Sequence, residues 1–215
     1  MDTLPDSKWL VRETSDAYIY GFKQGSPEWH KHRCIGGSVI SAAIGASRYM
    51  TREEAIAGII HPRSLDMTTP IIRGLVGEDV VRKYISLKTG VEFEQVGMAI
   101  SKKYPWMRAS PDGIYTLPDG KLGILEIKII SSQYRSNIAI AAHDKDPIFI
   151  DHLHQVNYTA GIIGATEITY ATLLWTDECR ILVRRFAPNM NLFERIHVPK
   201  AREIYNEILE CLKPF

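Results

Sequence analysis

The sequence predicts an α/β protein with a central mixed β-sheet flanked by helices. Two observations support this prediction: helix-forming segments occupy most of residues 26–90, and strand-forming segments dominate from residue 91 onward, with two further helices among them. The resulting order, αααα–βββ–α–ββ–α, is typical of a sheet covered on its faces by helices. With 215 residues, 45% of them hydrophobic, the chain can bury a substantial core as one domain.

Capping residues place the four N-terminal helices. Ser26, followed by a proline, is a favourable N-cap and predicts a helix of one to two turns. Gly36-Gly37-Ser38 opens a short second helix, and Thr51 opens a third with a capping box. Residues 71–89 form an amphipathic fourth helix, which Gly90 ends.

The remaining elements follow from apolar runs and turn residues, such as the Pro-Asp-Gly turn that joins two strands. We expect strands at 91–100, 107–117, 121–130, 168–176 and 180–187, and helices at 148–164 and 191–212. Residues 1–215 are expected to form one domain, with an N-terminal extension at 1–25, a motif-bearing core at about 26–176 and a C-terminal strand and helix at about 177–215.

Net charge and cysteine content narrow the function classes. The net charge of +1 provides no general positive field, so contacts with nucleic acid would depend on local basic clusters such as residues 30–33. The three cysteines are far apart and lack a C-x-x-C spacing, which indicates a reducing compartment and argues against zinc or iron–sulfur sites. No apolar run approaches the roughly 18 residues of a membrane span. We therefore expect a cytoplasmic protein, or a nuclear one in a eukaryotic cell, with no membrane contact.

Asp112, Glu126 and Lys128 are the strongest candidates for a chemical site. In residues 123–130, GILEIKII, Glu126 and Lys128 are the only polar side chains, and period-two alternation puts them on one face of the strand. Burying these charges costs several kcal/mol unless a partner such as a divalent cation compensates. Asp112, in the turn Ser110-Pro111-Asp112-Gly113, can direct a second carboxylate to the same point. Two carboxylates suit Mg²⁺, and a nearby lysine suits hydrolysis of a phosphodiester.

A purely structural explanation of these residues stays open. Glu126 and Lys128 can form an ion pair on an exposed strand, and the sequence around Asp112 is also that of an ordinary turn.

Glu78 is a further candidate because it follows Gly74 and Gly77 in a predicted helix. Glycines within a helix cost about 1 kcal/mol each relative to alanine, so they suggest close packing or a ligand. Taken alone, Glu78 can also be an ordinary carboxylate on a helix surface.

Gln155, in the helix at 148–164, is placed to position a water or a phosphate. His152 and His154 lie nearby, but residues at i and i+2 of a helix face different directions. We expect neither histidine to bind a metal, and His154 to be the better candidate for a contact with the DNA backbone.

Several short motifs, taken together, resemble those of a known family. The blocks Trp29-His30-Lys31-x-Arg33, Ile35-Gly36-Gly37-Ser38, Gly77-Glu78, Ser110-Pro111-Asp112-Gly113, Glu126-Ile127-Lys128 and Gln155 occur in the order and approximate spacing of the phage lambda exonuclease family, also called YqaJ-like viral recombinases. The resemblance covers roughly residues 26–176. It implies a restriction-endonuclease-like core of the PD-(D/E)xK nuclease superfamily.

The resemblance implies roles for the matched residues. Asp112, Glu126 and the backbone carbonyl of Ile127 would bind Mg²⁺, with Mn²⁺ as a substitute, and Lys128 would activate the attacking water. Glu78 would act through a water or a second metal ion.

Gln155 would orient the nucleophile or the phosphate. Arg33 and Ser38 match the family's pocket for a terminal 5′-phosphate, with the amides of Gly36 and Gly37 contributing. The family often has Thr-Ala before the matching serine, so this chain would depend more on backbone N–H groups. Arg33 can alternatively be a solvated cation at a helix end. Weaker candidates for contacts with the DNA backbone are Trp29, Arg48, Arg73 and His154.

The sequence therefore predicts a Mg²⁺-dependent deoxyribonuclease that degrades linear double-stranded DNA from its ends, 5′ to 3′, and generates single strand for recombination. The resemblance also implies a phage or viral origin, a homotrimer and a single-strand annealing protein as partner. Two alternatives stay open: a sequence- or structure-selective endonuclease on the same core, and a non-catalytic module that binds DNA ends.

Overall fold

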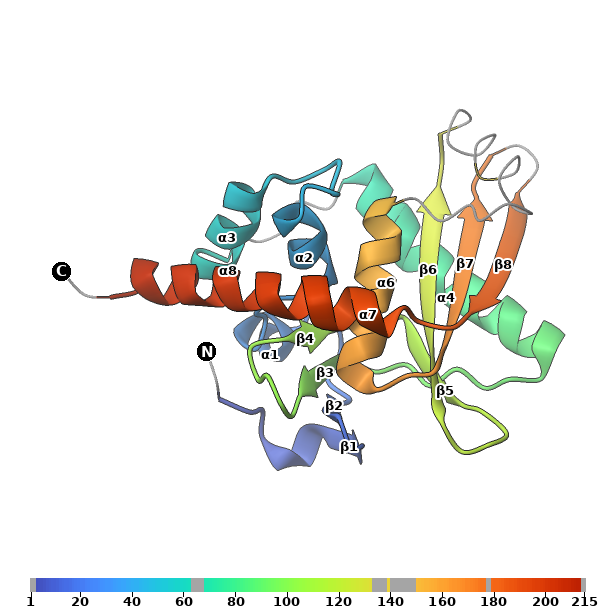
Figure 1. The fold of residues 1–215 in the computed structure, drawn as a ribbon. Coiled ribbons are helices and arrows are strands. Elements are labelled where there is room, and N and C mark those ends of the chain that lie inside the picture. The colour runs from blue at the N-terminus through green and yellow to red at the C-terminus, as the bar shows by residue number, and fades with distance from the viewer. Residues whose placement is uncertain (1–2, 63–67, 133–138, 140–149, 177–178, 214–215) are drawn as a thin grey trace.

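The computed structural model describes residues 3–62, 68–132, 139, 150–176 and 179–213, and these contain two four-stranded sheets (Figure 1). The first sheet is antiparallel, in the order β1 (Leu10–Glu13), β2 (Ala17–Tyr20), β3 (Met98–Ser101) and β4 (Arg108–Ala109). The second has the order β5 (Gly113–Thr116), β6 (Leu122–Ile130), β7 (Glu167–Leu174) and β8 (Arg180–Phe186). Strands β6 and β7 are parallel and the other two pairs are antiparallel, which confirms the predicted mixed sheet.

The predicted helices form in the described part of the chain, which excludes residues 148 and 149 at the start of the helix expected at 148–164. The N-terminal ones are α1 (Pro27–Lys31), α2 (Gly37–Ala43), α3 (Arg52–Ile60) and α4 (Thr69–Thr89). Ser26 caps α1, Thr51 and Glu54 form the capping box of α3, and Gly90 ends α4 with a left-handed φ of 69°. Further along lie α6 (Ile150–Ile163), α7 (Met190–Leu192), a π-helical turn (Phe193–His197) and α8 (Val198–Cys211), with a short 3₁₀ turn at Ser7–Trp9.

Helices α4 and α6 cover opposite faces of the mixed sheet, as Figure 1 shows. Leu125 and Ile127 of β6 pack with Val81 and Ile85 of α4, while Ile124 belongs to the core cluster under α6. The period-two alternation of β6 is thereby confirmed. None of the helices in the described part of the chain has both the length and the apolar content of a membrane span.

Gly77 allows the close approach of α4 to the sheet. A β-carbon at this position would lie 2.7 Å from Cδ1 of Ile129, whereas one at Gly74 would meet only an oxygen of Glu78, at 3.8 Å. The presence of Gly77 is therefore explained by the close packing of α4 against β6.

Two strand predictions differ from the structure. Residues 107–117 form two strands, β4 and β5, which belong to different sheets, so the segment Ser110–Asp112 crosses between them. Proline at position 111 cannot donate a hydrogen bond to a sheet, which favours a break there. In the expected strand at 91–100, only the end forms a strand, while Glu94 makes an isolated bridge to Ile114.

The segment predicted as an N-terminal extension contributes β1 and β2 to the first sheet. Ala17 to Tyr20 pair with Ser101 to Met98 of β3, across about eighty residues of chain. This pairing is non-local, so the short apolar segment AYIY gave no sign of its partner.

Candidate active site

Strand β6 brings Glu126 and Lys128 to the face on which α6 packs. Glu126 is only 2% exposed, and its Oε1 accepts hydrogen bonds from Lys128 Nζ at 2.6 Å and from Gln155 Nε2 of α6 at 2.7 Å. Its other oxygen, Oε2, is buried and has no hydrogen-bond partner among the described residues. A buried carboxylate oxygen without a partner is costly, so this atom is placed for a ligand.

Asp112 is fixed against the same strand. Its Oδ2 accepts a hydrogen bond from the backbone N–H of Ile127 at 2.6 Å, and its own N–H donates to the carbonyl of Leu125 at 3.1 Å. On the other side, Nε of Arg82 donates to the carbonyl of Asp112 at 2.8 Å. The crossing segment is therefore held so that Asp112 faces Glu126.

Two carboxyl groups of the site have raised pKa values, mainly because of burial. Burial raises the pKa of Asp112 well above its usual range, and repulsion from Glu126 and Glu78 adds to the increase. Burial likewise raises the pKa of Glu78, although attraction to Lys128 opposes it. Burial lowers the pKa of Lys128, but attraction to Glu126 and Asp112 outweighs burial and raises the pKa overall. Lys128, together with Arg82, which also attracts Glu78, thus faces three carboxyl groups.

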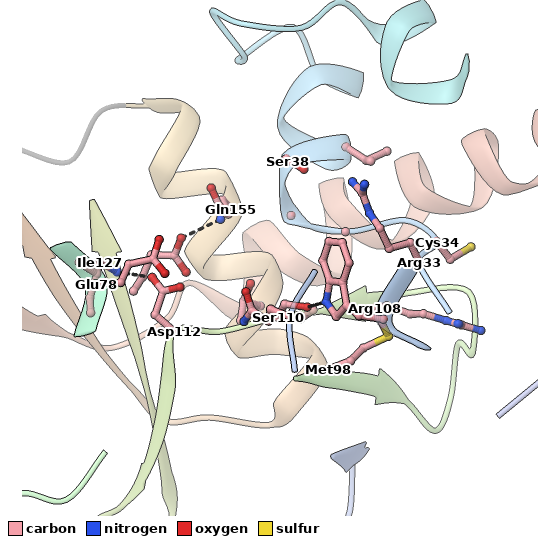
Figure 2. A pocket seen from close by; sticks show the side chains of 18 of the residues that line it. Arg33, Cys34, Ser38, Glu78, Met98, Arg108, Ser110, Asp112, Ile127 and Gln155 are labelled. Carbon is pink, nitrogen blue, oxygen red and sulfur yellow. Dashed lines mark hydrogen bonds between the residues drawn. The ribbon is translucent and has the colours of Figure 1, made fainter. Parts of the chain in front are cut away.

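A pocket of about 270 Å³ extends from these carboxylates to Arg33 and Ser38 (Figure 2). The guanidinium of Arg33 lies 4.8 Å from the centre of the Trp29 ring, and burial lowers the pKa of Arg33. Arg33 is thus half-buried inside the pocket, which favours a ligand-binding role over that of a solvated cation at a helix end.

Gly36 and Gly37 line this pocket at the start of α2. A β-carbon on Gly37 would lie 2.7 Å from Cγ of Gln155, so the close approach of α6 requires glycine here. This contact gives a physical reason for glycine at position 37.

The structure brings most of the predicted site residues together. The pocket is lined by Glu78, Asp112, Glu126, Ile127, Lys128 and Gln155 at one part and by Trp29, Arg33, Gly36, Gly37 and Ser38 at another. Arg48, Arg73 and His154 are not among the residues that line it.

The two histidines of α6 have partners outside the pocket. Nδ1 of His154 lies 3.0 Å from Nε2 of the buried His197, and Nδ1 of His152 lies 2.6 Å from the Tyr170 hydroxyl. Burial, together with repulsion from His154, lowers the pKa of His197 to about 4, and burial also lowers the pKa of His154.

Three side chains around the site were not predicted. Arg82 lies four residues after Glu78 on α4, a spacing that puts both on one helix face and was a usable signal. Gln24 donates to the carbonyl of Pro111 at 3.2 Å, and Ser110 accepts from Trp29 Nε1 at 2.9 Å. Gln24 lies in a segment without a motif, so only the folded chain reveals its role.

The donor set fits a hard divalent cation. No three His, Cys, Asp or Glu side chains of the described residues form a ready-made metal cage. Mg²⁺, however, usually keeps several waters and binds through one or two carboxylates, so Asp112 and the unpartnered Oε2 of Glu126 meet that requirement. Burial, with repulsion from Glu126 and Glu78, raises the pKa of Asp112, and a bound cation would offset both effects.

Comparisons with known proteins agree with this fold. A model of the YqaJ-like viral recombinase domain matches residues 27–167. An alkaline exonuclease, LHK-Exo from Laribacter hongkongensis, superposes with a TM-score of 0.69 at 18% sequence identity, covering 86% of this chain and 93% of that chain. The same protein in complex with dAMP gives a TM-score of 0.68 at 17% identity, with coverage of 86% and 96%.

A phage-related exonuclease from Haemophilus somnus 129PT gives a TM-score of 0.62 at 12% identity, with coverage of 85% of this chain and 97% of that chain. No curated protein sequence matches significantly. The predicted α/β fold is confirmed, and it is consistent with a PD-(D/E)xK-like core.

Replacing Asp112 with asparagine should stabilise the metal-free protein near neutral pH. Folding raises the pKa of Asp112. The stability that the protonated carboxyl group contributes is therefore complete below the ordinary pKa of an aspartate and is lost as the pH rises through the pKa of the folded state. The asparagine amide avoids this loss and can still accept from the Ile127 N–H. Thermal unfolding in chelator should give a higher Tm for Asp112→Asn at about pH 7.5, and the gain should shrink towards about pH 4.

The matched control is Asp119→Asn, on an exposed turn. There, hydrogen bonding to Lys121 lowers the pKa, so the same substitution should give no gain in Tm at neutral pH. An equal Tm for wild type and Asp112→Asn at both pH values would show that Asp112 is not destabilised by its surroundings.

Proposed function

The chain belongs to the YqaJ-like viral recombinase family, and from this premise we propose that it is a Mg²⁺-dependent exodeoxyribonuclease that degrades linear double-stranded DNA from 5′ ends. Two of its structural neighbours are exonucleases, which supports a nuclease activity. The chemistry of the pocket supports metal dependence and a preference for 5′ ends, and membership of the family supports a role in recombination.

One observation supports this function above the others: the same pocket contains the carboxylates of Asp112 and Glu126 and the guanidinium of Arg33. A phosphodiester to be hydrolysed needs charge compensation at the scissile phosphate, and a terminal phosphate needs a cationic site of its own. A single pocket with both kinds of group suits a DNA strand whose 5′ end is held while the next phosphodiester is cut.

Asp112, Glu126 and the carbonyl of Ile127 would hold Mg²⁺, with Mn²⁺ as a substitute. The bound ion would supply Lewis-acid stabilisation of the negative charge that develops on the phosphate. Glu78, whose pKa is raised by burial, would contribute through a water or a second ion.

Lys128 would act as a cation. Its pKa is raised, so the ammonium stays protonated at neutral pH and favours ionisation of a nearby water by electrostatic attraction. Gln155, which holds Glu126 Oε1, would keep this carboxylate in place and orient the water or the phosphate. Water attacks the scissile phosphorus, the bond to the 3′-oxygen breaks, and that oxygen takes up a proton.

The products of this reaction favour repeated cuts from the same end. Breaking the bond to the 3′-oxygen leaves the phosphate on the 5′ side of the remaining strand. Each cut therefore regenerates a 5′-phosphate, which Arg33 and Ser38 with the Gly36 and Gly37 amides would bind again. The single strand that remains would be the substrate of a strand-annealing partner in recombination.

Removing a metal ligand should abolish hydrolysis. Asp112→Asn or Glu126→Gln takes away ligand charge with little change in volume, so turnover of a linear 5′-phosphorylated duplex should fall on the order of 10³-fold. Wild type in chelator should be equally inactive, and Asp119→Asn should keep wild-type turnover. More than a tenth of wild-type turnover in either ligand variant would place the site elsewhere.

The same assay separates the rival activities. Cutting of closed circular DNA would favour an endonuclease, and binding of ends without turnover would favour a non-catalytic module.

Arg33 should determine the preference for a 5′-phosphate. A bidentate, charge-assisted contact contributes about 1.5–3 kcal/mol, so wild type should digest 5′-phosphorylated ends at least tenfold faster than 5′-hydroxyl ends. Arg33→Ala should remove the preference mainly by slowing the phosphorylated substrate. Equal rates of wild type on both ends would contradict an end-binding role, and equal weakening on both ends by Arg33→Ala would indicate a general DNA contact.

We also propose that the protein assembles as a homotrimer. Large apolar side chains lie exposed along α4, and such a stripe is usually covered by another chain; they are Ile72, Leu75, Val76, Val80, Tyr84 and Leu87. Light scattering should give about three times the chain mass of 24.4 kDa, and Val80→Asp with Leu87→Asp should reduce it. A monomeric wild type would contradict the proposed trimer without contradicting the proposed nuclease activity.

A further inference from the structure

The crossing segment Ser110–Asp112 is held at each of its three residues by a distant side chain. Trp29 Nε1 donates to Ser110 Oγ at 2.9 Å, Gln24 Nε2 to the Pro111 carbonyl at 3.2 Å and Arg82 Nε to the Asp112 carbonyl at 2.8 Å. The segment lies between strands of two different sheets. Its conformation, and with it the direction of the Asp112 carboxylate, depends on these contacts.

Trp29 differs from the other two because it also contacts the cationic part of the pocket. The centre of its ring lies 4.8 Å from the guanidinium carbon of Arg33, within the range of a cation–π contact. The ring face therefore contacts Arg33 while the ring N–H donates to Ser110, two residues from Asp112.

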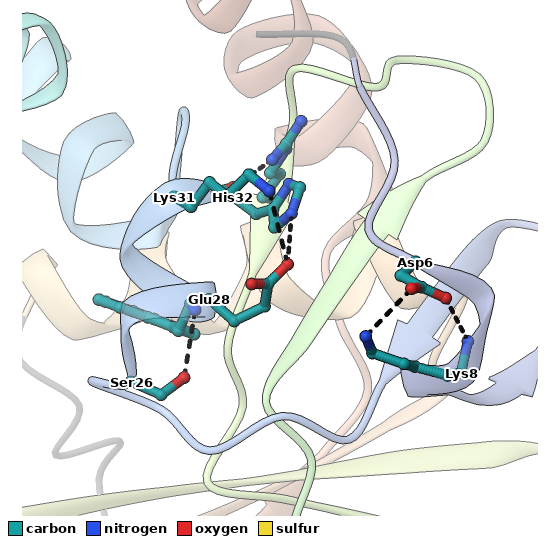
Figure 3. A network of polar contacts seen from close by, with 8 residues as sticks. Asp6, Lys8, Ser26, Glu28, Lys31 and His32 are labelled. Atoms are coloured by element: carbon teal, nitrogen blue, oxygen red, sulfur yellow. Dashed lines mark hydrogen bonds and ion pairs between the residues drawn. The ribbon is translucent and has the colours of Figure 1, made fainter.

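Trp29 is itself held firmly, although α1 has only five residues. A helix this short is not stable alone. Ser26 Oγ accepts the N–H of Trp29 at 3.2 Å, and Glu28 Oε1 lies 3.1 Å from Nε2 of the buried His32, whose carbonyl accepts from Arg108 (Figure 3). These contacts fix α1 at both ends, so the position of the indole is set by the fold.

We propose that Trp29 is a positioning residue that joins the two parts of the pocket: its ring orients Arg33 for the terminal phosphate, and its N–H orients Asp112 through Ser110. This inference rests on the proposed nuclease function. The two contacts use different parts of the side chain, so they can be separated by substitution. Trp29→Phe keeps an aromatic face beneath Arg33 and removes the N–H, while Ser110→Ala removes the same hydrogen bond from the other side.

Both variants should slow hydrolysis without removing the preference for a 5′-phosphate. Loss of one hydrogen bond in a positioning network should lower the single-turnover rate on linear 5′-phosphorylated duplex about five- to tenfold. The double variant Trp29→Phe/Ser110→Ala should be no slower than the slower single variant, because both changes delete one bond. Arg33→Ala should show the opposite pattern, a lost preference for the phosphate.

Calorimetric titration with Mn²⁺ in the absence of DNA gives a readout that does not depend on activity. Trp29→Phe and Ser110→Ala should weaken Mn²⁺ binding about threefold or more, since Asp112 is less well fixed, whereas Arg33→Ala should bind as wild type does. Trp106→Phe is the matched control: the Trp106 Nε1 is buried without a hydrogen-bond partner among the described residues, so the same substitution should change neither the rate nor Mn²⁺ binding.

Three results would overturn the positioning role: wild-type rate and Mn²⁺ affinity in Trp29→Phe, rate losses that multiply in the double variant, or a loss of phosphate preference in Trp29→Phe equal to that of Arg33→Ala. Thermal unfolding verifies that each variant is folded, and Ser110→Ala tests the same bond if Trp29→Phe unfolds. A wild type inactive on linear DNA would refute the nuclease proposal, and the Mn²⁺ titrations would still test Trp29.

Discussion

The buried carboxylate of Glu126 is the constraint on which the rest of the site depends. Strand β6 places this group in an apolar sheet with 2% of its surface exposed, where an isolated charge is unstable. Lys128 and Gln155 satisfy one oxygen and leave the other without a partner. Asp112 and Glu78 lie close by, and burial raises the pKa of both, with repulsion from Glu126 adding to the increase.

The position of Asp112 is a property of the whole fold. Its segment is the connection between two sheets, and side chains from the N-terminal loop, α1 and α4 hold that connection in place. Residues remote from the chemistry therefore control how the carboxylate meets Glu126. The same arrangement brings α1, and with it Arg33, to the pocket that contains the carboxylates.

The sequence correctly predicted the features that depend on residues close together in the chain. The capping box at Thr51, the left-handed Gly90 and the alternation in β6 depend on residues close in the chain, and the structure has all three. The strand at 107–117 was wrong as a single element because the chain passes from one sheet to the other at Pro111, which cannot donate a hydrogen bond to a sheet. Strands β1 and β2 were missed because β2 pairs with β3, far away in the sequence, and β1 pairs with β2.

The sequence by itself determined the chemistry of the site: two carboxylates, a lysine and a glutamine in a pattern that predicts metal-assisted hydrolysis, together with the family resemblance that the matched domain confirms. Only the tertiary structure decided which other side chains support it. Gln24 and Arg82 belong to no motif, and Ser110, which lies in the block around Asp112, meets Trp29 only when α1 reaches the crossing segment. The physical reason is that residue type fixes what a group can do, whereas contacts between distant segments fix where it stands and which charges surround it.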